Sequence, residues 1–226
     1  MRRHLTRAAA LMLAIALTLG AFGSALASGS PGAASGDPAF AGGKKRIDGF
    51  TDVNNHWARD SISFAIEHNI MNGMTETEFW PNFPMTRAML VTVLWRIETK
   101  PPHSNPSAFT DVPDGLWYSD AVAWASENNI VQGRGDNTFD PMSEVSRQDF
   151  CVMLYRFAVK TGRDERSWKP SIVFTDYEEI SLYARDAVNW CSEHGIINGR
   201  LLGEFDPYDS ATRAEGCHML RLFLEK

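Results

Sequence analysis

Three arginines stand at matching positions of this 226-residue chain, namely Arg87, Arg147 and Arg213. Each lies 30 residues after an aromatic residue, and each follows a Ser or Thr that suits the N-cap of a helix. We therefore expect each arginine at a helix start, where free backbone N–H groups and the helix dipole favour an anion. The forked guanidinium group adds donors that match a carboxylate. The pattern predicts carboxylate binding at up to three places.

Other residues near the arginines offer surfaces that a ligand could contact. Trp57 and Trp117 offer a flat apolar face to a ring or a methyl group. Gly135 lets the backbone approach a ligand closely, and Gly133 and Asp136 lie in the same loop. We predict that these residues bind the ligand together with the arginines.

The three places are not expected to be equal. The first copy has Thr75 and Glu76 in place of the loop glycine and aspartate, and Glu76 would repel an anion. The third copy has Tyr183 in place of tryptophan. Because only the second copy keeps all these side chains, we expect the groove that uses Arg147 to bind most tightly.

Structural roles for the same residues stay open. The arginines would then form ion pairs with aspartates, and the tryptophans would pack in the core or between repeats. The candidate partners are Asp52, Asp111 and Asp176 of three Phe-Thr-Asp triplets, and Asp60, Asp120 and Asp186. The triplet aspartates are themselves expected in turns, where a short carboxylate binds nearby backbone N–H groups.

These residues belong to three units, predicted at residues 47–98, 109–159 and 172–226. Apolar residues at helical spacing predict a helix, a loop and a second helix in each unit, so the expected fold class is mainly α. About 50 residues is small for an independent core, so we expect the units to pack on each other.

The ends of the helices carry recognisable residues. The first helices are expected to begin at N-caps Asn55, Gly115 and Ser181, and to stop at left-handed glycines Gly73, Gly133 and Gly199. The second helices are expected to begin at N-caps Thr86, Ser146 and Thr212. Each connecting loop spans 14 residues from glycine to arginine, and its phenylalanine is expected to fill the core: Phe79, Phe139 or Phe205.

The N-terminal part predicts export. Residues 1–27 combine a basic start, a short apolar stretch and a small-residue cleavage site, so they resemble a signal peptide and not a membrane span. Residues 28–46 are rich in Gly, Ala and Ser and predict a flexible linker. The leader holds three Arg and no acid, so its removal takes the net charge from −6 to −9. The acidic mature chain shows no basic patch for nucleic acid.

The cysteines predict neither a disulfide framework nor a metal site. Cys151 and Cys217 each follow a repeat arginine by four residues, and Cys191 aligns with alanines, so small buried side chains are expected. A Cys191–Cys217 bridge stays open because export permits it. No Cys or His pair has ligand spacing, and no nucleophile–base motif or nucleotide loop is visible. We therefore predict no metal, no cofactor and no catalytic residue.

Three sets of motifs resemble the S-layer homology family. Its pattern combines a Phe-x-Asp opening, a Trp near the first helix, a glycine-containing loop ending in Phe-x-Pro, and a Thr-Arg-Ala-Glu helix start. The matching strings are Phe109-Thr110-Asp111, Trp117, Gly133 to Pro141, Thr212-Arg213-Ala214-Glu215 and Thr86-Arg87-Ala88-Met89. The resemblance covers about residues 47–226.

The resemblance implies a fold and a task. The expected fold is a pseudo-threefold, mostly helical module that lies outside the cell, at the cell wall or S-layer. The expected ligand is cell-wall polysaccharide, usually a secondary wall polymer with pyruvate ketals, or peptidoglycan-linked glycan, held without covalent bonds between neighbouring units. The alternatives are a surface adaptor that binds an envelope protein, and a wall-glycan hydrolase.

Overall fold

The computed structural model describes residues 46–165 and 172–226, which belong to one unit spanning 34–226. The predicted signal peptide at 1–27 lies outside the described residues, and so does the predicted linker except Arg46. Within the described residues the chain forms six α-helices, three short 3-10 helices and no β-sheet. The mainly α prediction is therefore confirmed.

Each repeat contributes two α-helices. The helices are α1 (Arg59–Glu67), α2 (Arg87–Ile97), α3 (Ser119–Glu127), α4 (Arg147–Thr161), α5 (Arg185–Glu193) and α6 (Arg213–Leu224). The 3-10 helices are η1 (Ile47–Gly49), η2 (Tyr177–Glu179) and η3 (Leu201–Gly203).

The second helix of each repeat begins where the sequence predicts. Thr86, Ser146 and Thr212 are N-caps whose hydroxyl oxygens accept the backbone N–H three residues later. In α6 the Glu215 side chain also accepts from the Thr212 backbone N–H, which completes a capping box. Gly216 in α6 leaves space for Met85, because a Cβ there would lie 2.4 Å from the Met85 sulfur.

The first helix of each repeat begins later than predicted. α1, α3 and α5 start at residues 59, 119 and 185, after the aromatic residue, and no side chain caps them. The residues before them form short turns instead, such as Arg59 N–H to His56 O at 3.0 Å and Ala184 N–H to Ser181 O at 2.8 Å. These turns supply acceptors for the helix start, so the predicted N-caps at Asn55, Gly115 and Ser181 are wrong.

The first helices also stop at other residues than predicted. The left-handed residues that follow them are Asn69, Asn129 and Gly195, with φ of 55°, 57° and 61°. Asparagine tolerates this conformation because its short side chain bonds locally. Gly73 and Gly133 serve close packing: an added Cβ would lie 2.2 Å from Phe50 and 2.8 Å from Phe109. Of the predicted stops only Gly199 has a positive φ, of 80°.

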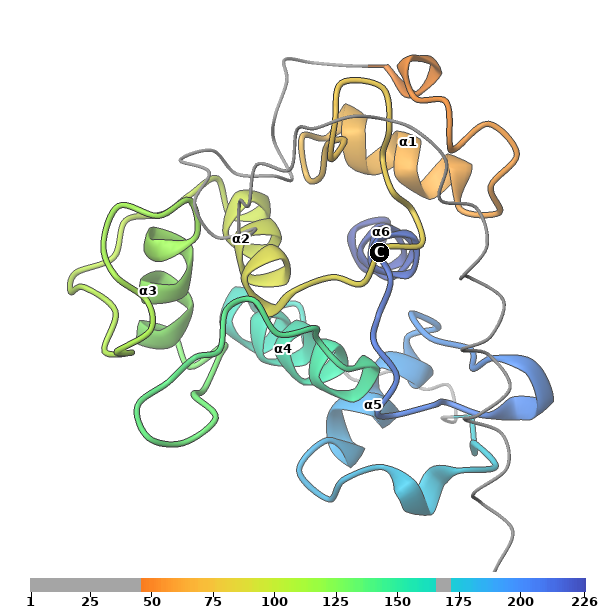
Figure 1. The fold of residues 1–226 in the computed structure, drawn as a ribbon. Coiled ribbons are helices and arrows are strands. Elements are labelled where there is room, and N and C mark those ends of the chain that lie inside the picture. The colour runs from red at the N-terminus through yellow and green to blue at the C-terminus, as the bar shows by residue number, and fades with distance from the viewer. Residues whose placement is uncertain (1–45, 166–171) are drawn as a thin grey trace, which may run out of the picture. The chain divides into compact units, whose positions relative to one another are not determined.

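The main helix pairs join different repeats. Helix α3 packs on α2, α5 packs on α4, and α1 packs on α6 (Figure 1). The first helix of each repeat thus covers the second helix of the preceding repeat, and the first repeat closes onto the third. The expectation that the units pack on each other is confirmed, and the packing is cyclic.

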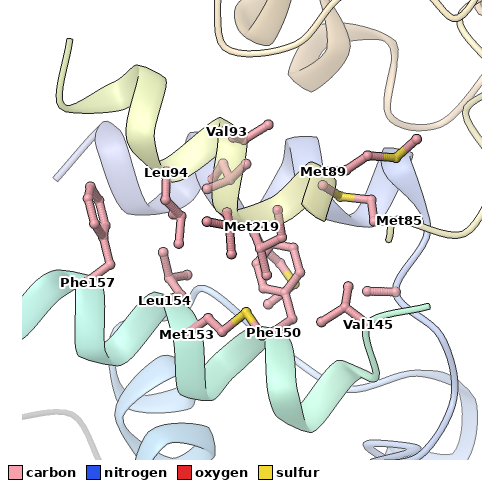
Figure 2. Packing of buried hydrophobic residues seen from close by; sticks show 14 of the residues in the cluster. Met85, Met89, Val93, Leu94, Val145, Phe150, Met153, Leu154, Phe157 and Met219 are labelled. Atoms are coloured by element: carbon pink, nitrogen blue, oxygen red, sulfur yellow. The ribbon is translucent and has the colours of Figure 1, made fainter. Parts of the chain in front are cut away.

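The second helices meet around one shared core. Figure 2 shows Leu94 of α2 pointing toward Leu154 of α4, with Phe150 further along α4 and Met219 of α6 between the two helices in this view. All four side chains are at most 4% exposed. Burying one such side chain contributes about 1.5–3 kcal/mol, so each repeat depends on apolar surface from the other two.

Three backbone hydrogen bonds close a ring within this core. Met85, Val145 and Ala211 each immediately precede an N-cap, and all three are fully buried. The N–H of Met85 donates to Ala211 at 2.8 Å, that of Ala211 to Val145 at 3.0 Å, and that of Val145 to Met85 at 2.8 Å. Each repeat therefore gives and receives one bond, and the three repeats form one closed set.

The triplet aspartates hold the loops, as expected for turn residues. The Asp176 carboxylate accepts the N–H groups of Phe205 and Asp206 at 2.8 and 2.7 Å. Asp52 and Asp111 bind the two matching N–H groups in their own repeats. The loop turns sharply here, because Asp206 has a φ of 56°, and the phenylalanine before it is fully buried.

Asp176→Ala should lower the free energy of unfolding by about 2–4 kcal/mol, because two backbone donors lose their acceptor. Urea denaturation measures this change. Asp114→Ala is the matched control, since Asp114 is exposed, and should stay within about 0.5 kcal/mol of wild type. Equal stabilities of the two variants would contradict the proposed role of Asp176.

Candidate ligand grooves between the repeats

Each repeat arginine reaches into the next repeat. Arg87 donates from Nε to Phe139 O at 2.9 Å and from Nη2 to Gln132 O at 3.0 Å. Arg147 Nε donates to Phe205 O at 2.7 Å. Arg213 closes the cycle by donating to Phe79 O at 3.0 Å and, from Nη2, to a second carbonyl of the first repeat. The arginines therefore connect the repeats in the same order as the helix packing.

The helix starts at the arginines hold no free backbone donors. The N–H groups of Arg87 and Ala88 donate to Ser143 O and Pro141 O, both at 2.9 Å. The next N–H, of Met89, donates to the Thr86 cap. Helices α4 and α6 repeat this pattern with carbonyls of the third and first repeats. The expectation of free N–H groups for an anion is therefore wrong, and any anion contact must come from side chains.

The repeat arginines are buried cations. Arg87, Arg147 and Arg213 are 4%, 6% and 0% exposed, and each guanidinium lies over the buried Phe of the next repeat, 4.4–5.2 Å from the ring centre. Burial lowers the pKa of Arg213 to about 10, which still leaves it charged at neutral pH. None of the three forms an ion pair with the six aspartates considered above, as far as the described residues show.

One groove lies at Arg87, and we call it the Arg87 groove. It has a volume of about 270 Å³ and takes Arg87 from the first repeat and Tyr183 from the third. The second repeat supplies the remaining wall, namely Val131, Gln132, Gly133, Arg134, Asp149, Val152, Met153 and Arg156. Three repeats therefore meet in one groove.

The Arg87 groove carries unbalanced positive charge. Its walls hold the guanidinium groups of Arg87, Arg134 and Arg156 but a single carboxylate, that of Asp149. Asp149 accepts the Tyr183 hydroxyl at 2.8 Å and lies 3.7 Å from Arg134. Within the described residues no carboxylate oxygen lies within 4 Å of Arg87. Burial and the Arg134 charge both lower the pKa of Arg87.

A second groove, the Arg147 groove, has about 280 Å³ and a similar plan. Arg147 and Trp57 come from the second and first repeats, and the third repeat supplies Arg200, Glu215 and His218. Trp57 is 63% exposed and meets His218 edge-on at 5.6 Å.

The charges of the Arg147 groove are neutralised within the protein. Glu215 pairs with Arg147 at 2.8 Å and with Arg200 at 2.9 Å. Arg200 also pairs with Asp206 at 3.2 Å and with Asp209 at 2.6 Å. Burial would lower the pKa of Arg200, but these carboxylates outweigh it and raise the pKa.

The structure groups the predicted site residues differently from the sequence prediction. Gly133 lines the Arg87 groove, whereas Trp57 lines the Arg147 groove. Gly135 and Asp136 are exposed and line neither groove. Trp117 packs on the core and edge-on against Tyr118 at 5.1 Å.

The grouping of Trp117, Gly135 and Asp136 with Arg147 is therefore wrong. A repeat arginine points into the next repeat, and the aromatic residue of the groove comes from the repeat after that. Ligand contact by the predicted residues stays a prediction.

The sequence prediction missed several charged groove residues. Arg134 and Arg200 directly follow the loop glycines Gly133 and Gly199, whereas Met74 follows Gly73. This Gly-Arg pair is the sequence feature that could have pointed to Arg134 and Arg200 as groove residues. Nothing in the local sequence places Asp149 or Glu215 beside another repeat's arginine.

The cysteines are buried and free. Cys151, Cys191 and Cys217 are fully buried, and the Cys191–Cys217 bridge is not formed. Burial raises the pKa of Cys217 to about 12, so its thiol is unreactive at neutral pH. Across residues 46–165 and 172–226 no group of three His, Cys, Asp or Glu side chains is arranged to hold a metal ion. The same residues contain no helix long and apolar enough to cross a membrane.

Comparison with known proteins identifies the family. The S-layer homology domain matches residues 49–88, 108–151 and 173–215. The chain belongs to this family, and its three repeats are three copies of that domain.

Named relatives share this region. An amylopullulanase of Thermoanaerobacterium thermosulfurigenes is 30% identical over 78% of this chain, and an S-layer protein of Bacillus thuringiensis subsp. finitimus is 26% identical over 81%. A cellulosome-anchoring protein of Acetivibrio thermocellus is 26% identical over 66%. The matches span only 10%, 22% and 34% of those proteins.

Glu215→Gln should make stability less dependent on pH. Burial alone would raise the pKa of Glu215, but the Thr212 N–H group and the charges of Arg200 and Arg147 lower it. A lowered pKa stabilises the fold above the usual glutamate range, and this stabilisation is lost as the pH falls through the lowered pKa. Glutamine keeps the capping box but not the charge.

The variant should therefore be less stable than wild type at pH 7, by about 1–3 kcal/mol, and the gap should shrink towards about pH 3. Urea denaturation at both pH values measures the gap. A gap that stays constant with pH would contradict the charged role of Glu215.

Proposed function

We propose that this chain anchors non-covalently to a carboxylate-bearing polymer of the bacterial cell wall, at the cell surface. The observation that carries the proposal is the Arg87 groove, where three guanidinium groups face a single carboxylate. Family membership supports it, and so do relatives named as S-layer and cellulosome-anchoring proteins.

The groove suits a pyruvate ketal on a wall polysaccharide. The carboxylate of such a ketal would accept donors from Arg134 and Arg156, next to the buried charge of Arg87. Val152 and Met153 offer apolar surface to the ketal methyl, and the half-exposed ring of Tyr183 suits a sugar face. These local charges act against a chain whose overall charge is negative.

Glycan hydrolysis is the less favoured function. Most glycosidases need two carboxyl groups on opposite sides of the scissile bond. The Arg87 groove is lined by one, Asp149, which is bound to Tyr183 and Arg134. The amylopullulanase relative matches this chain over only 10% of its own length. A surface adaptor that binds an envelope protein remains a prediction.

Arg134→Gln and Arg156→Gln should each weaken binding to purified cell walls about tenfold, since each removes roughly 1.4 kcal/mol of charged hydrogen bonding. Co-sedimentation measures the affinity, using walls before and after chemical removal of pyruvylated polysaccharide. Wild type should bind only the untreated walls.

Arg221→Gln is the matched control. Arg221 pairs with Glu225 at 2.9 Å and lines neither groove, so its loss should leave binding unchanged. Equal loss in all three variants would indicate unspecific charge attraction, and no loss in the groove variants would exclude the Arg87 groove as the wall-binding site.

A further inference from the structure

We propose that the length of one acidic side chain decides whether a groove of this protein accepts a carboxylate ligand. Asp149 leaves the Arg87 groove open, whereas Glu215 fills the Arg147 groove as an internal ligand. This inference rests on the proposed function and adds the residue that selects between the grooves.

The two acids occupy the same place in the repeat. Asp149 is the third residue of α4, and Glu215 is the third residue of α6. Each faces a repeat arginine of the preceding repeat and the arginine after the loop glycine of its own repeat. The Arg87 groove pairs Arg87 with Arg134, and the Arg147 groove pairs Arg147 with Arg200.

Glu215 shows what binds between two such arginines. Its Oε1 accepts from Arg147 Nη1 at 2.8 Å and from Arg200 Nη2 at 2.9 Å. Its Oε2 is held by the Thr212 backbone N–H at 2.8 Å. A carboxylate oxygen of the protein therefore already takes the donors that a ligand carboxylate would need.

Asp149 has one methylene fewer and does not bridge its arginines. Its Oδ1 accepts the Tyr183 hydroxyl at 2.8 Å, and its Oδ2 stays 3.7 Å from Arg134. Tyr183 turns the carboxylate towards the third repeat, and no carboxylate of the described residues comes within 4 Å of Arg87. The donors of Arg87 and Arg134 that face the groove therefore lack the internal bridge that Glu215 forms.

Other carboxylates neutralise Arg200 more than Arg134. Arg200 has Asp206 at 3.2 Å and Asp209 at 2.6 Å in addition to Glu215. Arg134 has Asp140 at 3.9 Å, and Ser143 replaces the second aspartate in its repeat. Arg134 therefore keeps more of its charge for a ligand than Arg200 does.

The corresponding place at Arg213, between the third and first repeats, lacks both parts of this arrangement. Met89 takes the place of the acid, and Met74 takes the place of the arginine after the glycine. Arg213 is fully buried, and its Nη1 has no hydrogen-bond partner. Without an arginine after the loop glycine, the place at Arg213 should not bind a carboxylate, so the wild-type chain should hold one ligand.

Exchanging the acids tests the proposal, because Asp149→Glu and Glu215→Asp leave the net charge unchanged. The probe is a methyl mannoside that carries a pyruvate ketal, and calorimetry gives the number of sites. The indole N–H NMR signal of Trp57 reports on the Arg147 groove, because that groove alone of the two contains a tryptophan.

Wild type should bind one probe without a shift of the Trp57 signal. Asp149→Glu should weaken this binding at least tenfold, and Glu215→Asp should bind two probes and shift the signal. The double variant should bind one probe and shift the signal. Glu215→Ala removes the filling side chain and should also open the Arg147 groove, and because alanine favours a helix it covers the case in which the aspartate variant is poorly folded.

Two outcomes overturn the inference alone. They are folded Glu215→Asp and Glu215→Ala variants that both still bind one probe, and an Asp149→Glu variant with wild-type affinity. If wild type binds no probe, the proposed carboxylate site fails and the inference fails with it. Thermal melting of each variant separates lost binding from lost folding.

Discussion

The structure depends on buried hydrogen bonds that pass from each repeat to the next and finally back to the first. Met85, Val145 and Ala211 exchange backbone bonds in a closed ring, and the repeat arginines add side-chain bonds in the same direction. Buried polar groups are costly without partners. Removing one repeat would leave such groups unpaired in both of the others, so the three repeats stabilise one another as a set.

The same constraint builds the grooves. Because each arginine must donate into the next repeat, and each first helix covers the preceding repeat, the Arg87 and Arg147 grooves each combine residues of all three copies. The buried arginine is common to both grooves. The grooves differ in the partly exposed charges around this arginine, with Asp149 in one groove and Glu215 in the other. Neither residue belongs to the backbone ring of Met85, Val145 and Ala211.

Much of the local structure could be predicted from the sequence. The caps at Thr86, Ser146 and Thr212, the buried loop phenylalanines and the turn role of Asp176 follow from short-range chemistry. The first helices were placed too early, because an Asn or Ser before an apolar run resembles a cap even when turns already satisfy the helix N–H groups. The glycines were assigned to helix stops, although phenylalanine rings explain Gly73 and Gly133.

The sequence by itself determined that three helical units repeat, that they share a core, and that one arginine per unit holds a fixed position. Only the tertiary structure decided what surrounds each arginine. Helix pairing between repeats brings Arg87 to Arg134 and Arg147 to Glu215, although 47 and 68 residues separate these pairs in the chain. The physical reason is cyclic closure, which places neighbours by buried contacts between copies and not by distance along the sequence.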